Sequence, residues 1–187
     1  AMGAQYNNRR VFLVYPGTVS VNTSVALDGS ASASTSVPSF YAASALVGMV
    51  ADKPVGQGFT NLAVGNILGV TKSSDYFTKS QLNSIAGGGT LILFQEGLAS
   101  TTTSPVLVRH QLATDVSSIV KRELSITKSI DRVSQTLRAT LKPTIGVFNI
   151  TNALLETITM SIQSILGRMR NEGVIAGGSL SSIAVNS

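Results

Sequence analysis

The sequence contains no cysteine and no tryptophan, and His110 is the single histidine among its 187 residues. Without cysteine the chain can form neither a disulfide framework nor a thiolate metal site. Zinc is bound by cysteine, histidine and carboxylate side chains, so one histidine and no cysteine argue against a zinc site as well. We therefore expect no metal and no cofactor. A chain without cysteine is suited to folding in a reducing cytoplasm.

Charged residues are also scarce, at 12% of the chain against about 25% in ordinary soluble domains. A surface so poor in charge is more often covered by partner proteins than exposed to water, and this points toward an assembly. The net charge is +5, and the excess lies after residue 100, where nine basic residues face five acidic ones. Nucleic-acid-binding proteins cluster their basic residues more densely, so we expect no direct contact with nucleic acid. No apolar run is long enough to cross a membrane, and we expect no insertion into one.

Apolar runs and helical periodicity predict a single domain of the α/β class. In detail we expect an α+β layer sandwich, with a mixed sheet of about four to five strands packed by three to four helices. The expected strands are residues 10–15, 90–95 and 106–112, with weaker candidates at 124–127 and 180–186. The expected helices are residues 39–51, 78–86, 128–141 and 152–171. The segment 18–36 is either a long loop or a weak hairpin, 52–65 is irregular, and 97–105 is a polar turn.

Local signals define several ends of these elements. Ser36 or Ser39 is expected to cap the helix 39–51, whose small apolar residues on all sides predict burial on more than one side. Thr78 and Gln81 have the spacing of a capping box. The three glycines at 87–89 follow a helix and precede a strand, the reverse of a phosphate-binding loop, so we interpret them as a helix stop. The glycines at 56 and 58 indicate a turn.

His110 is the one candidate for a general base, with Asp115 and either Ser117 or Ser118 nearby in the sequence. No nucleophile-elbow pattern accompanies these residues, and the carboxylates are scattered along the chain. We interpret His110 as a strand residue beside a turn and predict that the protein is not an enzyme. A small hydrolase that uses His110 or Asp115 is the alternative.

The two C-terminal helices carry the clearest periodicity. The first has a basic face of Lys128, Arg132, Arg138 and Lys142. Its apolar stripe is Ile130, Val133, Leu137 and Leu141. The basic face is either simply solvated, or an interaction surface for an acidic neighbour, or a nucleic-acid contact.

The second helix carries Arg168 and Arg170 in its last turn, where cations oppose the helix dipole. Its longer apolar stripe is Leu154, Leu155, Ile158, Ile162, Ile165, Leu166 and Met169.

Three segments in order resemble the sheath family of contractile tails in bacteriophages and related injection machines. They are residues 106–115 (VLVRHQLATD), 122–131 (RELSITKSID) and 137–149 (LRATLKPTIGVFN). The helix at 41–50, the QGFTN stretch at 57–61 and the GGGTLILF strand at 87–94 also have family counterparts. The resemblance covers most of residues 38–186 and includes no catalytic signature.

The resemblance implies a structural role. Sheath subunits form hexameric rings, stacked as a helical sleeve around a tail tube, and their contraction drives the tube through the host envelope. Terminal arms add strands to neighbouring subunits. The free energy comes from rearranged subunit contacts, and a baseplate signal releases a metastable extended state. The expected partners are other copies of the subunit, the tube protein and baseplate proteins. The expected location is the virion, after assembly in the host cytoplasm.

Residue roles follow from the same resemblance. The helix 152–171 matches the family's inner helix, so Arg168 and Arg170 are candidates for tube contact. The basic face of the preceding helix is a second candidate, for tube or neighbour, and strands 10–15 and 106–112 are candidates to accept an arm. A different baseplate or tube-associated component is the alternative within the same class of machine.

We expect residues 1–3 to be a tag remnant, 4–37 the N-terminal strand and loop of the core, and 38–187 a sheath-like C-terminal core domain. The chain ends near the last expected core strand, and we expect it to be a truncated fragment that lacks both linker arms. Such a fragment is expected to be monomeric in isolation.

Overall fold

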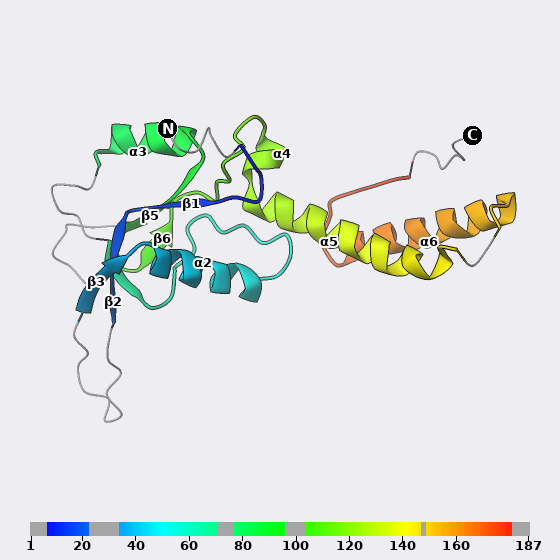
Figure 1. Ribbon diagram of the computed structural model, residues 1–187, viewed down its shortest axis with the longest axis horizontal. Helices are drawn as coiled ribbons and strands as arrows, with labels where there is room; N and C mark the ends of the chain where they lie inside the picture. The colour runs from blue at the N-terminus through cyan, green and yellow to red at the C-terminus, as the bar shows by residue number, and fades with distance from the viewer. Residues whose placement is uncertain (1–6, 23–33, 71–76, 96–103, 147–148, 181–187) are drawn as a thin grey trace, which may run out of the picture. The chain divides into compact units, whose positions relative to one another are not determined.

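A computed structural model describes residues 7–22, 34–70, 77–95, 104–146 and 149–180. It contains both helices and strands, and the predicted α/β class is confirmed (Figure 1). The strands are β1 (Leu13–Tyr15), β2 (Thr18–Asn22), β3 (Ser34–Pro38), β4 (Ile67–Val70), β5 (Thr90–Gln95) and β6 (Val106–Val108). The helices are α2 (Phe40–Asp52), α3 (Lys79–Gly87), α4 (Ile119–Arg122), α5 (Leu124–Leu141) and α6 (Asn152–Asn171), and the 3-10 turn η1 (Lys142–Thr144) follows α5.

The strands of the described residues form two three-stranded sheets, where the sequence predicted one sheet of four to five strands. The first has the order β1-β5-β6 and is mixed, because β1 runs parallel to β5 and β6 antiparallel to it. The second has the order β3-β2-β4 and is antiparallel. The predicted weak hairpin is present as β2 and β3. β4 was not predicted, since a four-residue apolar run that contains a glycine gives little periodic signal.

The chain divides into two compact units, residues 1–127 and 128–187. The first unit holds the main hydrophobic core, to which both sheets and α2 contribute. Its buried members are Val19, Ala42, Leu46, Val64, Ile67, Val70, Leu91, Leu93, Val106 and Val108. β5 is the central strand of the first sheet, since it lies between β1 and β6. The residues in the middle of β5 are buried.

Helix α2 confirms the predicted helix but not its predicted burial. Ala42 and Leu46 are buried, whereas Phe40, Tyr41 and Val47 are 61%, 51% and 70% exposed. The helix therefore packs on one side only within the described residues. Ser39 precedes the helix, but its backbone is helical and its side chain makes no capping hydrogen bond. The predicted cap by Ser36 or Ser39 is therefore wrong: a capping side chain needs an extended backbone at the residue before the helix, and Ser36 lies in β3.

Helix α3 begins and ends as the sequence predicts. The backbone N–H of Thr78 donates to Gln81 Oε1 at 2.9 Å, and the N–H of Gln81 donates to Thr78 Oγ1 at 3.5 Å, which completes the capping box. Gly89 follows the helix with a φ of 80°. A Cβ atom there would lie 2.7 Å from the carbonyl oxygen of Ala113, so only glycine fits this backbone conformation and this close approach.

Three predicted strands differ from the structure. The first, β1, begins at Leu13, three residues after its predicted start. Residues 124–127 are the first turn of α5 and not a strand, because Leu124 and Thr127 are buried at helical spacing. The strand-like pairing stops one residue earlier, at a bridge between Leu112 and Glu123. β6 ends at Val108, four residues before the predicted end. Most of the expected turn at 97–105 and of the expected strand at 180–186 lies outside the described residues.

The second unit is a helical hairpin in which α6 runs back along the part of α5 that follows residue 127 (Figure 1). Both predicted helices and the Thr151 cap are confirmed, with the Leu154 N–H donating to Thr151 Oγ1 at 3.2 Å. Only Ile165 and Met169 of the two apolar stripes are buried; the other members are half-buried. Two helices alone cannot cover both stripes, so this unit keeps apolar surface open to a partner.

Candidate interaction surface

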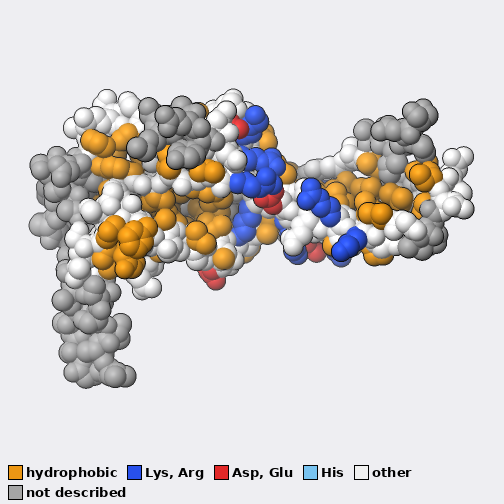
Figure 2. Space-filling model, in the orientation of Figure 1, with side chains coloured by type: hydrophobic (Ala, Val, Ile, Leu, Met, Phe, Trp, Pro, Cys, Tyr) orange, Lys and Arg blue, Asp and Glu red, His pale blue; other side chains and the backbone are white. Residues whose placement is uncertain are grey.

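The four basic residues predicted on the first C-terminal helix share one face in the structure. Lys128, Arg132 and Arg138 lie on α5, and Lys142 opens η1 directly after it. With 3.6 residues per turn, these positions fall within an arc of about 120°, opposite the apolar stripe. Arg132, Arg138 and Lys142 are exposed and Lys128 is half-buried. Figure 2 shows Lys and Arg side chains gathered over α5.

Three of these cations have no acidic partner within the chain's described part. No carboxylate there pairs with the side chain of Arg132, Arg138 or Lys142. No carboxylate among the described residues therefore neutralises their charge. An acidic protein surface would meet these groups without first breaking an existing ion pair, which favours charge complementarity as the recognition principle.

The two arginines near the end of α6 are separated by the helix geometry. Residues two apart on an α-helix differ by about 200° in direction, so Arg168 and Arg170 leave the helix on opposite edges of its apolar stripe. Arg168 Nε lies 3.6 Å from Glu172 Oε1, one turn further on. Met169, which lies between them on the apolar side, is already buried within the chain. A single partner that contacts both arginines therefore has to reach across the opposite side of the helix.

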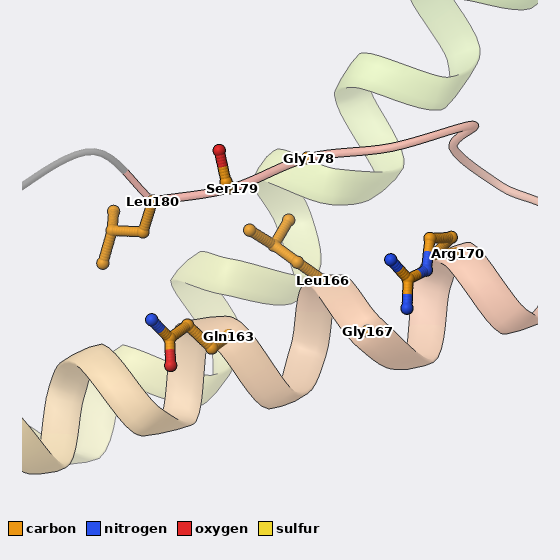
Figure 3. A pocket seen from close by; sticks show the side chains of 7 residues that line it. All are labelled: Gln163, Leu166, Gly167, Arg170, Gly178, Ser179 and Leu180. Atoms are coloured by element: carbon orange, nitrogen blue, oxygen red, sulfur yellow. The ribbon is translucent and has the colours of Figure 1, made fainter.

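Arg170 lies at a small cavity beside the segment that follows α6 (Figure 3). The cavity has a volume of about 210 Å³, and its walls come from α6 and from residues 178–180. Leu166 lies between the two, with Gln163 and Arg170 on either side of it (Figure 3). The Arg170 guanidinium and the Gln163 amide are the polar groups on the α6 side of the cavity, whereas the Ser179 hydroxyl points away from α6 (Figure 3). A guanidinium and an amide can both donate to a carboxylate.

The structure shows exposed apolar residues that the sequence did not single out. Ile145, Ile150 and Met160 are 76%, 70% and 62% exposed. The first two lie in the turn between η1 and α6, and Met160 lies on α6 outside the predicted stripe. The sequence did contain an indication of this apolar surface, because residues 143–155 carry no charged side chain.

The start of α5 is fixed to the first unit by a polar network that the sequence also did not reveal. Gln111 is buried; its Oε1 accepts from the Phe59 N–H at 2.9 Å, and its Nε2 donates to Glu123 Oε2 at 2.9 Å and to Ser125 Oγ at 2.8 Å. In addition, the backbone N–H of Leu124 donates a hydrogen bond to the carbonyl oxygen of Gln111 at 3.1 Å. Together these bonds hold the first turn of α5 in place.

The described contacts do not assemble the catalytic triad that the hydrolase alternative would need. His110 Nε2 contacts Glu123 Oε1 at 2.8 Å, whereas Asp115 Oδ1 accepts from the hydroxyl of Ser117 at 2.6 Å. The hydrogen bond from Ser117, reinforced by Lys121, lowers the pKa of Asp115 below its ordinary value. The histidine and the aspartate therefore belong to different groups, and Ser117 is bound to the aspartate instead of the histidine.

The described residues contain no group of three or more potential metal ligands, and none of their helices is long and apolar enough to cross a membrane. No protein-family model matches the chain, and no curated protein matches its sequence. Similarity is found at the level of the fold. Each of the similarities below involves sequence identity under 20%, so what they show is a shared three-dimensional arrangement.

The sheath tail protein of Desulfitobacterium hafniense matches with a TM-score of 0.67 and 12% identity over 90% of this chain and 36% of that chain. The anti-feeding prophage baseplate, solved with six-fold symmetry, gives a TM-score of 0.65 and 16% identity over 92% of this chain and 42% of the other. The contracted PVC sheath complex of an extracellular contractile injection system gives a TM-score of 0.64 and 12% identity over 95% of this chain and 46% of the other.

These structures define the class of fold: the chain is similar in fold to the sheath proteins of contractile tails and injection systems. The resemblance inferred from the sequence is thereby confirmed at the level of the fold. The chain spans less than half the length of each of these neighbours.

Proposed function

We propose that this chain is the core segment of a structural sheath subunit. In this proposal the subunit polymerises into hexameric rings around a tail tube, and contraction of the sleeve drives the tube through a host envelope. The observation that carries the proposal is the fold shared with a sheath tail protein over 90% of the chain. The open apolar surface and the low share of charged residues are consistent with a protein that functions inside an assembly.

The partners proposed are other copies of the subunit, the tube protein and the baseplate, and the proposed location is the virion or an equivalent particle. Work is done by rearranged subunit contacts, without nucleotide, metal or catalytic residue. Residues 38–187 are proposed as the sheath-like core, preceded by an N-terminal strand and loop at 4–37. Assembly in the host cytoplasm belongs to the same proposal.

We assign tube contact to Arg168 and Arg170, with Lys128, Arg132, Arg138 and Lys142 for the tube or a neighbouring subunit. The support is electrostatic and geometric. Arg170 lines a cavity with donor groups, and three of the α5 cations have no acidic partner in the described chain. An acidic tube surface would attract these groups.

The test is light scattering and negative-stain microscopy of this segment beside the full-length protein to which we propose it belongs. We expect the segment alone to remain monomeric and the full-length protein to form rings or sleeves. If the full-length protein stays monomeric at high concentration, with and without tail tubes, the sheath proposal fails.

A second candidate is a baseplate component of a contractile machine, favoured by the fold shared with the anti-feeding prophage baseplate. It differs in its stoichiometry: a baseplate component would form a single ring with a partner and would not extend into a sleeve. The same images distinguish the two, because sleeve length grows with protein concentration only for a sheath.

A further inference from the structure

A small cavity lies between α3 and the first sheet, wholly within the first unit. Its volume is about 250 Å³, and its wall comes from α3, β5 and the segment after β6, through side chains that include Asn83, Ala86, Ile92, Arg109 and Leu112. Pockets that hold a cofactor or a drug-sized ligand measure about 300–1,000 Å³. This cavity therefore has room for a single side chain or for a molecule of similar size.

The guanidinium of Arg109 is only partly paired. Its Nη2 donates to Asn83 Oδ1, whereas Nη1 is shielded from solvent and has no hydrogen-bond partner among the described residues. None of the ion pairs between described residues includes Arg109. A buried donor without an acceptor carries the full cost of its desolvation, and that cost is higher for a charged group. An acceptor that enters the cavity and reaches this guanidinium removes that cost.

The carboxylate of Glu123 is close to the same wall, but its oxygens are already engaged. Its Oε1 lies 2.8 Å from Nε2 of His110, which also lines the cavity, and 3.5 Å from Arg122 Nε. Its Oε2 accepts from Gln111 Nε2 at 2.9 Å. Because three groups hold this carboxylate, an acceptor for Arg109 has to come from elsewhere.

The cavity has the chemistry that a carboxylate on a short apolar stem requires. A guanidinium donates two parallel hydrogen bonds to the two oxygens of a carboxylate. The Asn83 amide adds a donor, since its oxygen accepts from Arg109 while its nitrogen has no partner among the described residues. Ala86, Ile92 and Leu112 give the wall an apolar part that suits methylene groups. Arg109 carries the one permanent positive charge in this wall, so a single negative charge balances it better than a doubly charged phosphate does.

We infer that the cavity beside Arg109 is a binding site for a carboxylate on a short apolar stem. Two sources carry such a group: the side chain of a glutamate in a partner protein, and a small free organic acid. The inference goes beyond the proposed sheath function and does not depend on it, because the site lies within the first unit and a monomeric segment presents it in full.

Titrations of the 15N-labelled chain, followed by NMR in a buffer without carboxylate or phosphate, test the site. One pair of probes is two capped tripeptides, with a central glutamate or a central glutamine. The other pair is butyrate and butyramide. Within each pair the neutral member is the control for contacts made by the stem. Inorganic phosphate is the fifth probe and tests whether the site prefers a single negative charge.

We expect saturable chemical-shift changes at the residues of the cavity with a carboxylate probe and not with its neutral counterpart. Arg109→Gln should weaken this binding about tenfold or more, because it removes a charged donor pair. Ala86→Leu should also weaken it, since the larger side chain occupies the cavity while Arg109 stays in place. Lys53→Gln is the matched control: it removes the same charge at the end of α2, outside the cavity, and should leave the affinity unchanged.

The two pairs of probes distinguish the sources. Binding of the glutamate peptide alone assigns the site to a partner protein, binding of butyrate alone assigns it to a free acid, and binding of both shows that the carboxylate itself is recognised. The inference is overturned if neither carboxylate binds more tightly than its neutral counterpart, or if phosphate binds more tightly than both. Unchanged affinity in Arg109→Gln overturns it as well. Should circular dichroism show that Arg109→Gln is unfolded, unchanged affinity in Ala86→Leu has the same consequence.

Discussion

His110 Nε2 lies 2.8 Å from Glu123 Oε1, and this contact joins the segment after β6 to the residue that precedes α5. The side chain of Glu123 is only 12% exposed, and its other oxygen accepts from Gln111. One carboxylate therefore satisfies two donors from the neighbouring segment. The sequence offered His110 as a possible catalytic base. In the structure its contact with Glu123 instead holds the start of α5 in place.

Glu123→Ala should destabilise the first unit by about 1–3 kcal/mol, because it removes an acceptor from partly buried donors. Glu123→Gln should cost less, since the amide keeps one acceptor for Gln111. The measurement is the free energy of unfolding from urea titration, with circular dichroism as the signal. A loss below about 0.5 kcal/mol for the alanine variant would show that the network contributes nothing beyond an ordinary surface contact.

The stability of the protein should depend on Asp115 at acid pH. The hydrogen bond from Ser117, with Lys121, lowers the pKa of this carboxyl below its ordinary value of 3.8 in the folded protein. A lowered folded-state pKa means that the stabilisation is present above the ordinary value and is lost as pH falls through the folded value. We therefore expect the parent to become less stable as pH falls from the ordinary value towards the lower folded-state pKa of Asp115. Asp115→Asn should lack this loss of stability.

Unfolding titrations between neutral pH and pH values below the ordinary aspartate range test this expectation. Asp52→Asn is the matched control, because Asp52 is 73% exposed and pairs only with its neighbour Lys53 among the described residues. The control should keep the acid dependence of the parent. If Asp115→Asn shows the same dependence as the parent, the acid loss originates in other carboxyl groups.

Gly89→Ala should be among the most damaging single-methyl changes in the chain. The added Cβ would lie 2.7 Å from the Ala113 carbonyl oxygen and 2.9 Å from Thr114 Cα, at a φ of 80°. Backbone strain of this kind costs about 1–3 kcal/mol before the clash is counted. Gly87→Ala is the control, since no atom lies within 4 Å of its Cβ position. There alanine should leave stability unchanged or raise it by up to about 1 kcal/mol. Comparable thermal midpoints for the two variants would contradict this account.

The sequence predicted those elements whose signal is local. The capping box at Thr78, the helix stop at Gly89 and the Thr151 cap depend on residues within a few positions, and all three are present. The strand assigned to 124–127 failed because a short apolar run reads the same in a strand and in the first turn of a helix. The pairing of Glu123 with Leu112, which settles the question, is a tertiary contact.

The candidate surface was predictable in part. Helical periodicity placed the α5 cations on one face, and the structure agrees. Periodicity could not show which cations lack an acidic partner among the described residues, since that depends on where the carboxylates lie in the fold. Nor could composition reveal the cavity beside Arg109, because its wall is formed by side chains from α3, β5 and the segment after β6 that come together only in the fold. Tube contact by the α5 cations stays a prediction.

The last prediction concerns the two arginines of α6. Arg168→Glu and Arg170→Glu should each weaken cosedimentation with purified tail tubes at low salt, and the effect should fade as salt screens the interaction. Arg170→Glu should be the more harmful, because Arg168 is already paired with Glu172 whereas Arg170 lies at the cavity shown in Figure 3.

Lys79→Glu is the control for this pair, because Lys79 is exposed on α3 of the first unit and the charge changes by the same amount. It should leave tube binding unchanged, and all three variants should retain the parent's unfolding transition. Met160 is exposed and lies on the side of α6 away from the apolar stripe, so Met160→Glu should weaken tube binding less than Arg170→Glu does. Tube binding that is unchanged by both arginine variants at low salt would remove α6 from the tube interface and leave the basic face of α5 as the candidate.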